Sequence, residues 1–228
     1  MDYTFQFGLL LNYLPQFISG FWLTMLLAFV GIFGGIALGI GCAVASTLPG
    51  WLPRFLVRCY VEAMRNTPLL VQIFVIFFGL PNIGVRMSPL ASVFIALVLN
   101  NGGYIAEIVR GGIQSTHRSQ VEAAESLGMT YLQTLRFVIL PPALEKVFTP
   151  IVSQCVLLML STSLVSAIGV EDLTGAAMIA SSETFRTMEV YLVIAAVYVL
   201  MNFVFRAILN LAGLLIFRRS RRNIFRGI

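Results

Sequence analysis

Five long apolar stretches, separated by short polar ones, make up most of the chain. Stretches without Asp, Glu, Lys or Arg run over 3–53, 66–85, 87–106 and 147–170, and a fifth, 190–217, is interrupted only by Arg206. A helix needs about 20 predominantly apolar residues to cross the hydrocarbon core of a bilayer. The period-two alternation that a transmembrane barrel requires is absent from the sequence. The pattern predicts five transmembrane helices, at roughly 18–46, 56–80, 88–112, 146–166 and 189–217.

The composition agrees with a membrane protein. Of the 228 residues, 58% are apolar and only 11% are charged, and the mean hydropathy is +0.91. A soluble domain carries about 25% charged residues. In lipid, helices satisfy every backbone N–H and C=O group internally. We therefore expect an all-α, polytopic membrane protein in which residues 1–228 form a single transmembrane domain.

The positions of Arg and Lys predict the orientation, because cytoplasmic loops carry an excess of basic residues. With a cytoplasmic C-terminus, only Arg86 and Arg186 fall outside and eleven basic residues fall inside: Arg54, Arg58, Arg110, Arg118, Arg136, Lys146, Arg218, Arg219, Arg221, Arg222 and Arg226. The N-terminus is then outside, where the acidic residues gather: Asp2, Glu171, Asp172, Glu183 and Glu189. The net charge of +5 is then explained by basic residues that face anionic lipid on the cytoplasmic side. We therefore do not expect the protein to bind nucleic acid.

The longest interval between predicted spans, 113–145, lies on the cytoplasmic side and contains signals for a helical hairpin. Ser119 and Glu122 have capping-box spacing, as do Thr130 and Gln133, and Gly128 between them can end a helix in the left-handed conformation. The following Pro141-Pro142 is expected to stop the second helix, and Leu127, Leu132 and Leu135 are expected to pack. Spacing alone supports equally a hairpin that folds back onto its own protein and one that docks a partner.

The order of residues in this loop carries a specific resemblance. Glu122-Ala123-Ala124, then Gly128, then Val138-Ile139-Leu140-Pro141 resembles the EAA loop of the membrane subunits of ABC importers. The stretches RNTPLLVQ (65–72), AEIVRGGIQS (106–115) and TSLVSAIG (162–169) are similar to stretches in permeases for polar amino acids. The resemblance implies a type I importer fold. It also implies that 113–145 is a coupling loop, in which Glu122, Ala123, Ala124, Gly128 and Pro141 meet an ATPase.

The same resemblance implies partners and a cargo. These are two ATPase subunits, a second permease chain in a homodimer or heterodimer, an extracytoplasmic substrate-binding protein that docks on 166–188, and a polar amino acid as cargo. The chain has no Gly-Lys-Ser/Thr sequence that could cradle phosphates. We therefore expect ATP to be bound and hydrolysed on the partner ATPase, and this chain to have neither a cofactor nor enzymatic activity. One histidine, His117, is too few for a metal site.

Polar residues inside the predicted spans are candidates for contact with the cargo, since such residues are costly in lipid. The candidates are Gln72, Asn100, Asn101, Ser161, Thr162 and Ser163. Each could instead hydrogen-bond to a neighbouring helix. Two pairs spaced three residues apart, Glu62 with Arg65 and Glu107 with Arg110, are expected to pair on one helical face.

Three glycines on the first span, Gly31, Gly35 and Gly39, allow close approach of another helix. We expect that helix to belong to the same chain, in preference to a second copy of the chain across a dimer interface. An ATP-independent channel or secondary transporter for a small polar solute remains an alternative function. It would rely on intramembrane carboxylates or histidines, which the deep parts of these spans almost lack. A membrane sensor or scaffold would use the hairpin but not the polar residues at mid-depth.

Overall fold

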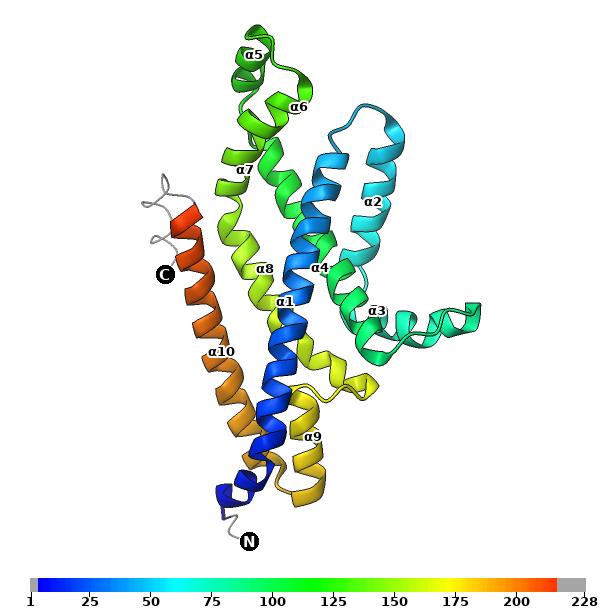
Figure 1. The fold of residues 1–228 in the computed structure, drawn as a ribbon, viewed down its shortest axis with the longest axis vertical. Coiled ribbons are helices and arrows are strands. Elements are labelled where there is room, and N and C mark those ends of the chain that lie inside the picture. The colour runs from blue at the N-terminus through cyan, green and yellow to red at the C-terminus, as the bar shows by residue number, and fades with distance from the viewer. Residues whose placement is uncertain (1–3, 217–228) are drawn as a thin grey trace.

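A computed structural model describes residues 4–216, and this part of the chain consists of helices joined by turns, with no strand (Figure 1). The helices are η1 (Phe7–Tyr13), α1 (Leu14–Ala45), α2 (Trp51–Arg65), α3 (Leu69–Phe74), η2 (Val75–Gly79), η3 (Leu80–Ile83), α4 (Pro89–Gln114), α5 (Arg118–Ser126), α6 (Tyr131–Gln133), η4 (Thr134–Ile139), α7 (Leu140–Lys146), α8 (Phe148–Ser161), η5 (Thr162–Ile168), α9 (Leu173–Thr184) and α10 (Thr187–Ile216).

Four helices within the described residues are long and apolar enough to cross a membrane: Phe7–Ala45, Pro89–Gln114, Phe148–Ile168 and Thr187–Leu215. A bent pair of helices, Trp51–Arg65 with Leu69–Ile83, makes a fifth span if it is counted as one. The all-helical polytopic prediction is confirmed at the level of four to five candidate spans. Several predictions fall outside the described residues: the acidic Asp2, the last residue of the 189–217 span, and the basic residues Arg218, Arg219, Arg221, Arg222 and Arg226.

The span predicted at roughly 56–80 is not one continuous helix. The chain turns by 107° between α2 and α3, and Pro68 lies at the turn with φ −61° and ψ 140°. Proline lacks the N–H needed to continue a helix, and its ring disfavours the helical conformation of the preceding residue, Thr67. In Figure 1 the segment from α3 to η3 therefore projects sideways from the bundle instead of extending the line of α2.

Close packing of α1 against α4 forms the centre of the bundle. A Cβ atom built on Gly31 would lie 3.0 Å from Leu97 Cβ, one on Gly35 would lie 2.5 Å from Asn101 Nδ2, and one on Gly39 would lie 2.6 Å from Ile105 Cβ. Only glycine allows the two backbones to approach this closely. The prediction that the glycine stripe packs within the chain is confirmed.

Two groups of elements lie at opposite ends of the long axis. The start of α1 lies beside α9 at one end, and α5 and α6 lie at the other (Figure 1). The acidic residues near α9 are less exposed to solvent than their sequence positions indicate, because Asp172 and Glu189 are fully buried. Asp172 Oδ1 accepts a hydrogen bond of 2.9 Å from the Gly175 N–H at the start of α9. Glu189 Oε1 lies 3.5 Å from Arg186 Nη1.

Candidate functional site

The first helix of the hairpin over 113–145 begins two residues earlier than an N-cap at Ser119 predicts. Helix α5 starts at Arg118, its N-cap is His117, and no side chain caps it. Ser119 therefore lies inside the first turn, and the predicted capping box with Glu122 is wrong. Instead, Glu122 Oε1 accepts a hydrogen bond of 2.9 Å from Arg118 Nε. Both side chains are largely exposed, so this ion pair adds little stability.

The turn after α5 follows the prediction. Gly128 has φ 75°, and its N–H donates to the Glu125 carbonyl at 2.9 Å while the Met129 N–H donates to the Ala124 carbonyl at 3.1 Å. These two hydrogen bonds form a Schellman motif, which ends the helix at a left-handed glycine.

The second capping box is also confirmed. The Thr130 N–H donates to Gln133 Oε1 at 2.8 Å, and the Gln133 N–H donates to Thr130 Oγ1 at 3.4 Å. Contrary to the prediction, Pro141-Pro142 does not end the second helix of the hairpin. A π-helical segment, η4, precedes the prolines, and they occupy the first turn of α7. Proline is tolerated at that position because the first N–H groups of a helix have no partner within it.

The tip of the hairpin presents apolar side chains away from the protein. Leu127 is 81% exposed and Leu132 is 65% exposed, whereas Leu135 is buried. The expectation that all three leucines pack is wrong for the first two. Of the residues that resemble the EAA motif, Glu122, Ala123, Gly128 and Pro141 are exposed and Ala124 is buried. Exposed leucines on both sides of a glycine turn are typical of a surface that another protein covers.

Two hydrogen bonds connect the hairpin segment to the ends of the long helices. The Tyr131 hydroxyl donates to the Thr47 carbonyl, just after α1, at 2.7 Å. Lys146 Nζ donates to the carbonyl of Ser115, just after α4, at 2.9 Å. A force on the hairpin would therefore reach α1 and α4 through direct contacts.

The polar candidates inside the bundle divide into separate groups. Gln72 and Asn100 come together, with Asn100 Nδ2 donating to Gln72 Oε1 at 3.1 Å. Gln72 Nε2 also donates to Thr67 Oγ1 at 2.7 Å and to the Met64 carbonyl at 2.9 Å. These residues form a polar brace across the break between α2 and α3, where the carbonyl groups near the end of α2 have no helical partner.

Asn101 faces a different neighbour. Its Nδ2 donates to the Gly31 carbonyl at 3.2 Å, and Gln154 Nε2 donates to its Oδ1 at 3.4 Å. These bonds join α1, α4 and α8 in a fully buried position. Gln154, a polar residue in the fourth predicted span, was missed as a candidate although its type and depth could have indicated it.

The hydroxyl cluster does not join either group. Ser161, Thr162 and Ser163 donate to the carbonyls of Leu157, Met159 and Leu160 in their own helical segment, at 2.7 to 2.8 Å. Such bonds satisfy hydroxyl groups locally.

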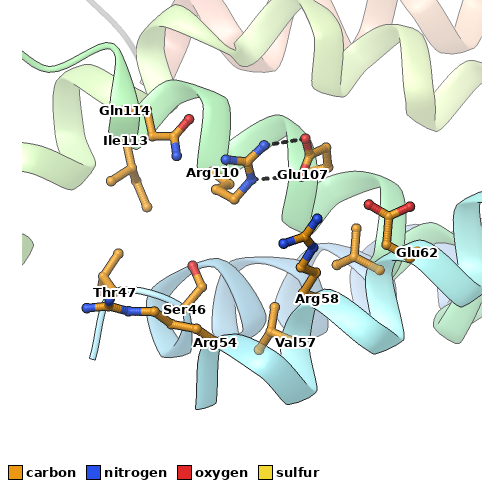
Figure 2. Close-up of a pocket in the computed structure, with 11 residues that line it drawn as sticks. Ser46, Thr47, Arg54, Val57, Arg58, Glu62, Glu107, Arg110, Ile113 and Gln114 are labelled. Carbon is orange, nitrogen blue, oxygen red and sulfur yellow. Dashed lines mark hydrogen bonds and ion pairs between the residues drawn. The ribbon is translucent and has the colours of Figure 1, made fainter. Parts of the chain in front are cut away.

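Two pockets lie along α2. The first, of about 270 Å³, adjoins the break and is lined by Ala63, Met64, Thr67, Val71, Gln72, Val75, Ile76 and Leu99. The second, of about 480 Å³, lies near the hairpin end between the close of α1, α2 and α4 (Figure 2). Its polar lining includes Arg54, Arg58 and Arg110. Within residues 4–216, no group of three His, Cys, Asp or Glu residues could hold a metal ion.

Comparison with known families decides which class of membrane protein presents this hairpin. Residues 35–216 match the family model described as the binding-protein-dependent transport system inner membrane component. The chain belongs to this family. It is a transport permease subunit of the inner membrane with several spans, and ATP hydrolysis takes place on a separate subunit. The family resemblance drawn from the loop is confirmed, and the channel and scaffold alternatives are set aside.

Similar proteins share most of the chain. The probable amino-acid ABC transporter permease protein YckA of Bacillus subtilis is 34% identical over 197 residues, which cover 86% of this chain and 87% of YckA. The glutamine transport system permease protein GlnP of Escherichia coli is 32% identical over 199 residues, which cover 86% of this chain and 91% of GlnP. A crystal structure of an amino acid ABC transporter with histidines superposes with a TM-score of 0.84 and 35% identity, over 92% of this chain and 99% of that one.

Proposed function

We propose that this permease forms half of the translocation pathway of an ATP-driven importer for polar amino acids. A second permease chain, identical or related, would complete the pathway. Two ATPase subunits would drive it, and an extracytoplasmic binding protein would deliver the cargo. The observation that carries the proposal is the capped hairpin with its two uncovered leucines, in a chain that belongs to a binding-protein-dependent family.

The hairpin is proposed as the coupling element. Its tip has a fixed shape, because the Schellman motif at Gly128 and the capping box at Thr130 define the backbone on both sides of the turn. Leu127 and Leu132 would enter an apolar groove of the ATPase. Closure of the ATPase pair would then move the hairpin, and the contacts at Thr47 and Ser115 would pass that movement to α1 and α4. ATP would thus bias an equilibrium between two orientations of the spans.

The orientation and the cargo complete the proposal. Five spans, with α2 and α3 counted as one, put the two ends of the chain on opposite sides of the membrane. The distribution of basic residues then supports an N-terminus outside and a hairpin in the cytoplasm. Relatives named for amino-acid and glutamine transport support a polar amino acid as cargo. The polar brace of Gln72 and Asn100, beside the pocket at the break, is the proposed contact region in mid-membrane. Ser161, Thr162 and Ser163 are weaker candidates, because their hydroxyl groups already have partners.

ATP hydrolysis by the assembled importer tests the proposal. The chain, its ATPase and its binding protein are placed in proteoliposomes, and amino acids are added one at a time. We expect one chemical class of polar amino acid to raise the rate. A Leu127→Ser, Leu132→Ser double variant should lose both the stimulation and co-purification of the ATPase, because the apolar contact is gone.

A Leu127→Met, Leu132→Met double variant serves as the matched control, since it keeps the apolar surface at similar volume. This control should retain the ATPase and the stimulation. Hydrolysis that ignores every amino acid would refute the cargo. Full retention of the ATPase by the serine variant would refute the docking role of the hairpin tip.

A further inference from the structure

The pocket near the hairpin end is lined by more positively than negatively charged side chains. Figure 2 shows Arg54 and Arg58 on α2, and Glu107 and Arg110 on α4, around the same space. Ser46, Thr47, Val57, Val61, Glu62, Ile113 and Gln114 complete the lining. Three arginines therefore face two glutamates.

The arginines of this pocket differ in their partners. Arg110 donates to both carboxylate oxygens of Glu107, which also lies 3.6 Å from Arg65. The predicted pairing of Glu107 with Arg110 is confirmed, whereas Arg65 pairs with Glu107 and not with Glu62. Within residues 4–216, neither Arg54 nor Arg58 forms an ion pair. Their charges are therefore free to meet a mobile anion.

The pocket adjoins a surface suited to lipid. On another side of α2, Trp51 is 74% exposed, and Leu52, Phe55 and Leu56 are each at least 50% exposed. The rings of Trp51 and Phe55 lie 6.0 Å apart at the beginning of the helix. Tryptophan is enriched where a membrane helix meets the headgroup layer. Arg54 and Arg58, one turn apart, thus lie at headgroup depth if this end of the molecule is cytoplasmic.

We propose that this pocket binds the phosphate of an anionic phospholipid headgroup in the inner leaflet. Guanidinium groups bind phosphate oxygens through paired hydrogen bonds, and basic pockets between membrane helices on the cytoplasmic side suit anionic headgroups. The acyl chains would lie against Trp51, Phe55 and Leu56. The inference rests on the proposed orientation of the permease.

Occupancy of the pocket would also affect the contact that attaches the hairpin to the end of α1. Thr47 lines the pocket, and its carbonyl accepts the hydrogen bond from the Tyr131 hydroxyl. A headgroup held by Arg54 and Arg58 would hold α2 beside the end of α1, to which the hairpin is attached. The lipid would therefore fix the position from which the coupling element moves.

Lipid retention by the full importer tests the inference. The complex is purified in detergent, stripped of lipid and titrated with phosphatidylglycerol, and bound lipids are counted by native mass spectrometry. An Arg54→Gln, Arg58→Gln double variant should bind about 30-fold more weakly at one site per permease chain, because each arginine contributes roughly fivefold at an anionic surface. An Arg118→Gln, Arg136→Gln variant removes the same charge from the hairpin and should bind as the unmodified protein does.

Two further arms identify the ligand. An Arg54→Lys, Arg58→Lys variant keeps the charge but loses the paired guanidinium donors, so its binding should fall between that of the unmodified protein and that of the glutamine variant. This intermediate binding separates recognition from misfolding. Phosphatidylcholine, which has no net charge, should not fill the site. Equal binding of phosphatidylglycerol by the glutamine variant would overturn the site. Displacement of the lipid by millimolar inorganic phosphate would overturn the lipid assignment in favour of a soluble phosphate, and persistence of the lipid would support it. Native mass spectrometry measures lipid binding and does not depend on transport. A failure of the lipid proposal is therefore distinguishable from a failure of the importer proposal, which amino-acid-stimulated ATP hydrolysis tests.

Discussion

The backbone conformation, rather than space, decides which residues fit at position 128. Gly128 has φ 75°, and a Cβ atom there would meet no atom within 4 Å. Left-handed backbone costs an ordinary L-residue about 1 kcal/mol or more, while asparagine visits it more readily. We therefore expect Gly128→Asn to keep the ATPase bound better than Gly128→Ala, although asparagine is larger. Co-purification of the ATPase measures the order. Better retention by the alanine variant would mean that the partner requires room at this turn.

Asp172 makes stability depend on pH at the opposite end of the molecule. Burial raises the pKa of its carboxyl from 3.8 to about 6, against hydrogen bonds from the Gly175 and Thr174 N–H groups and the Tyr198 hydroxyl that favour the charged form. Between pH 3.8 and about 6, the Asp172 carboxyl therefore keeps its proton in the folded state and has released it in the unfolded state. The contribution to stability is complete below pH 3.8 and is lost as the pH rises through about 6.

An Asp172→Asn variant should remove this dependence. Its amide oxygen can still accept from the Gly175 N–H, and no charge is left to bury. We expect thermal unfolding of the variant to change little between pH 4 and 6.5, whereas the original protein loses roughly 2 to 3 kcal/mol over that interval. The exposed neighbour Glu171 provides the control, since Glu171→Gln should keep the original pH profile. An unchanged profile in the Asp172→Asn variant would assign the pH dependence to another group.

Capping signals in the sequence predicted one side of the hairpin better than the other. Thr130 with Gln133 and Ser119 with Glu122 have the same spacing, but only the first pair forms a box. The spacing identifies where two side chains can satisfy the backbone. It does not determine where the chain turns, and the extended backbone at His117 starts α5 too early for Ser119 to cap it.

The break between α2 and α3 shows what hydropathy leaves out at the scale of an element. Asn66, Thr67 and Pro68 carry no charge and lie between apolar stretches, so a window average gives one span where the chain bends by 107°. Pro68 was visible in the sequence as a helix breaker. The partners of Gln72 and Asn100 were not predictable, because they include the Met64 carbonyl, which the break frees.

A Gln72→Leu substitution should destabilise this break. It removes the donor to Thr67 and Met64 and the acceptor for Asn100. Leaving buried polar groups without partners costs about 1 to 3 kcal/mol, so the thermal unfolding midpoint in detergent should fall. Ser163→Ala is the control, because Ser163 donates only to Leu160 in its own segment, and a change below about 0.5 kcal/mol is expected. Equal midpoints for the two variants would show that the brace does not hold the bend.

At the scale of the whole molecule, the sequence predicted the class and the family but not the distribution of charge. The motif stretches and the apolar spans depend on local residue order, which a sequence displays directly. The acidic face expected around 166–188 depends on packing. Asp172 and Glu189 lie in the interior, and Glu171 and Glu183 are the exposed acidic residues of that segment among those described. The face on which a binding protein would dock is therefore less acidic than a count of residues indicates.

The orientation of the molecule can be tested at its two ends. Phe185, between α9 and α10, is 88% exposed, and Leu127, at the hairpin tip, is 81% exposed. In a variant without Cys42, Cys59 and Cys155, a single cysteine is introduced at one of these two positions. An impermeant maleimide should label Phe185→Cys in intact spheroplasts and Leu127→Cys only after permeabilisation, because basic residues flank the hairpin end and hold it in the cytoplasm. Equal labelling of both in detergent is the control for thiol reactivity. The opposite pattern in spheroplasts would place the hairpin outside, out of reach of ATP, and would remove the basis for coupling through it.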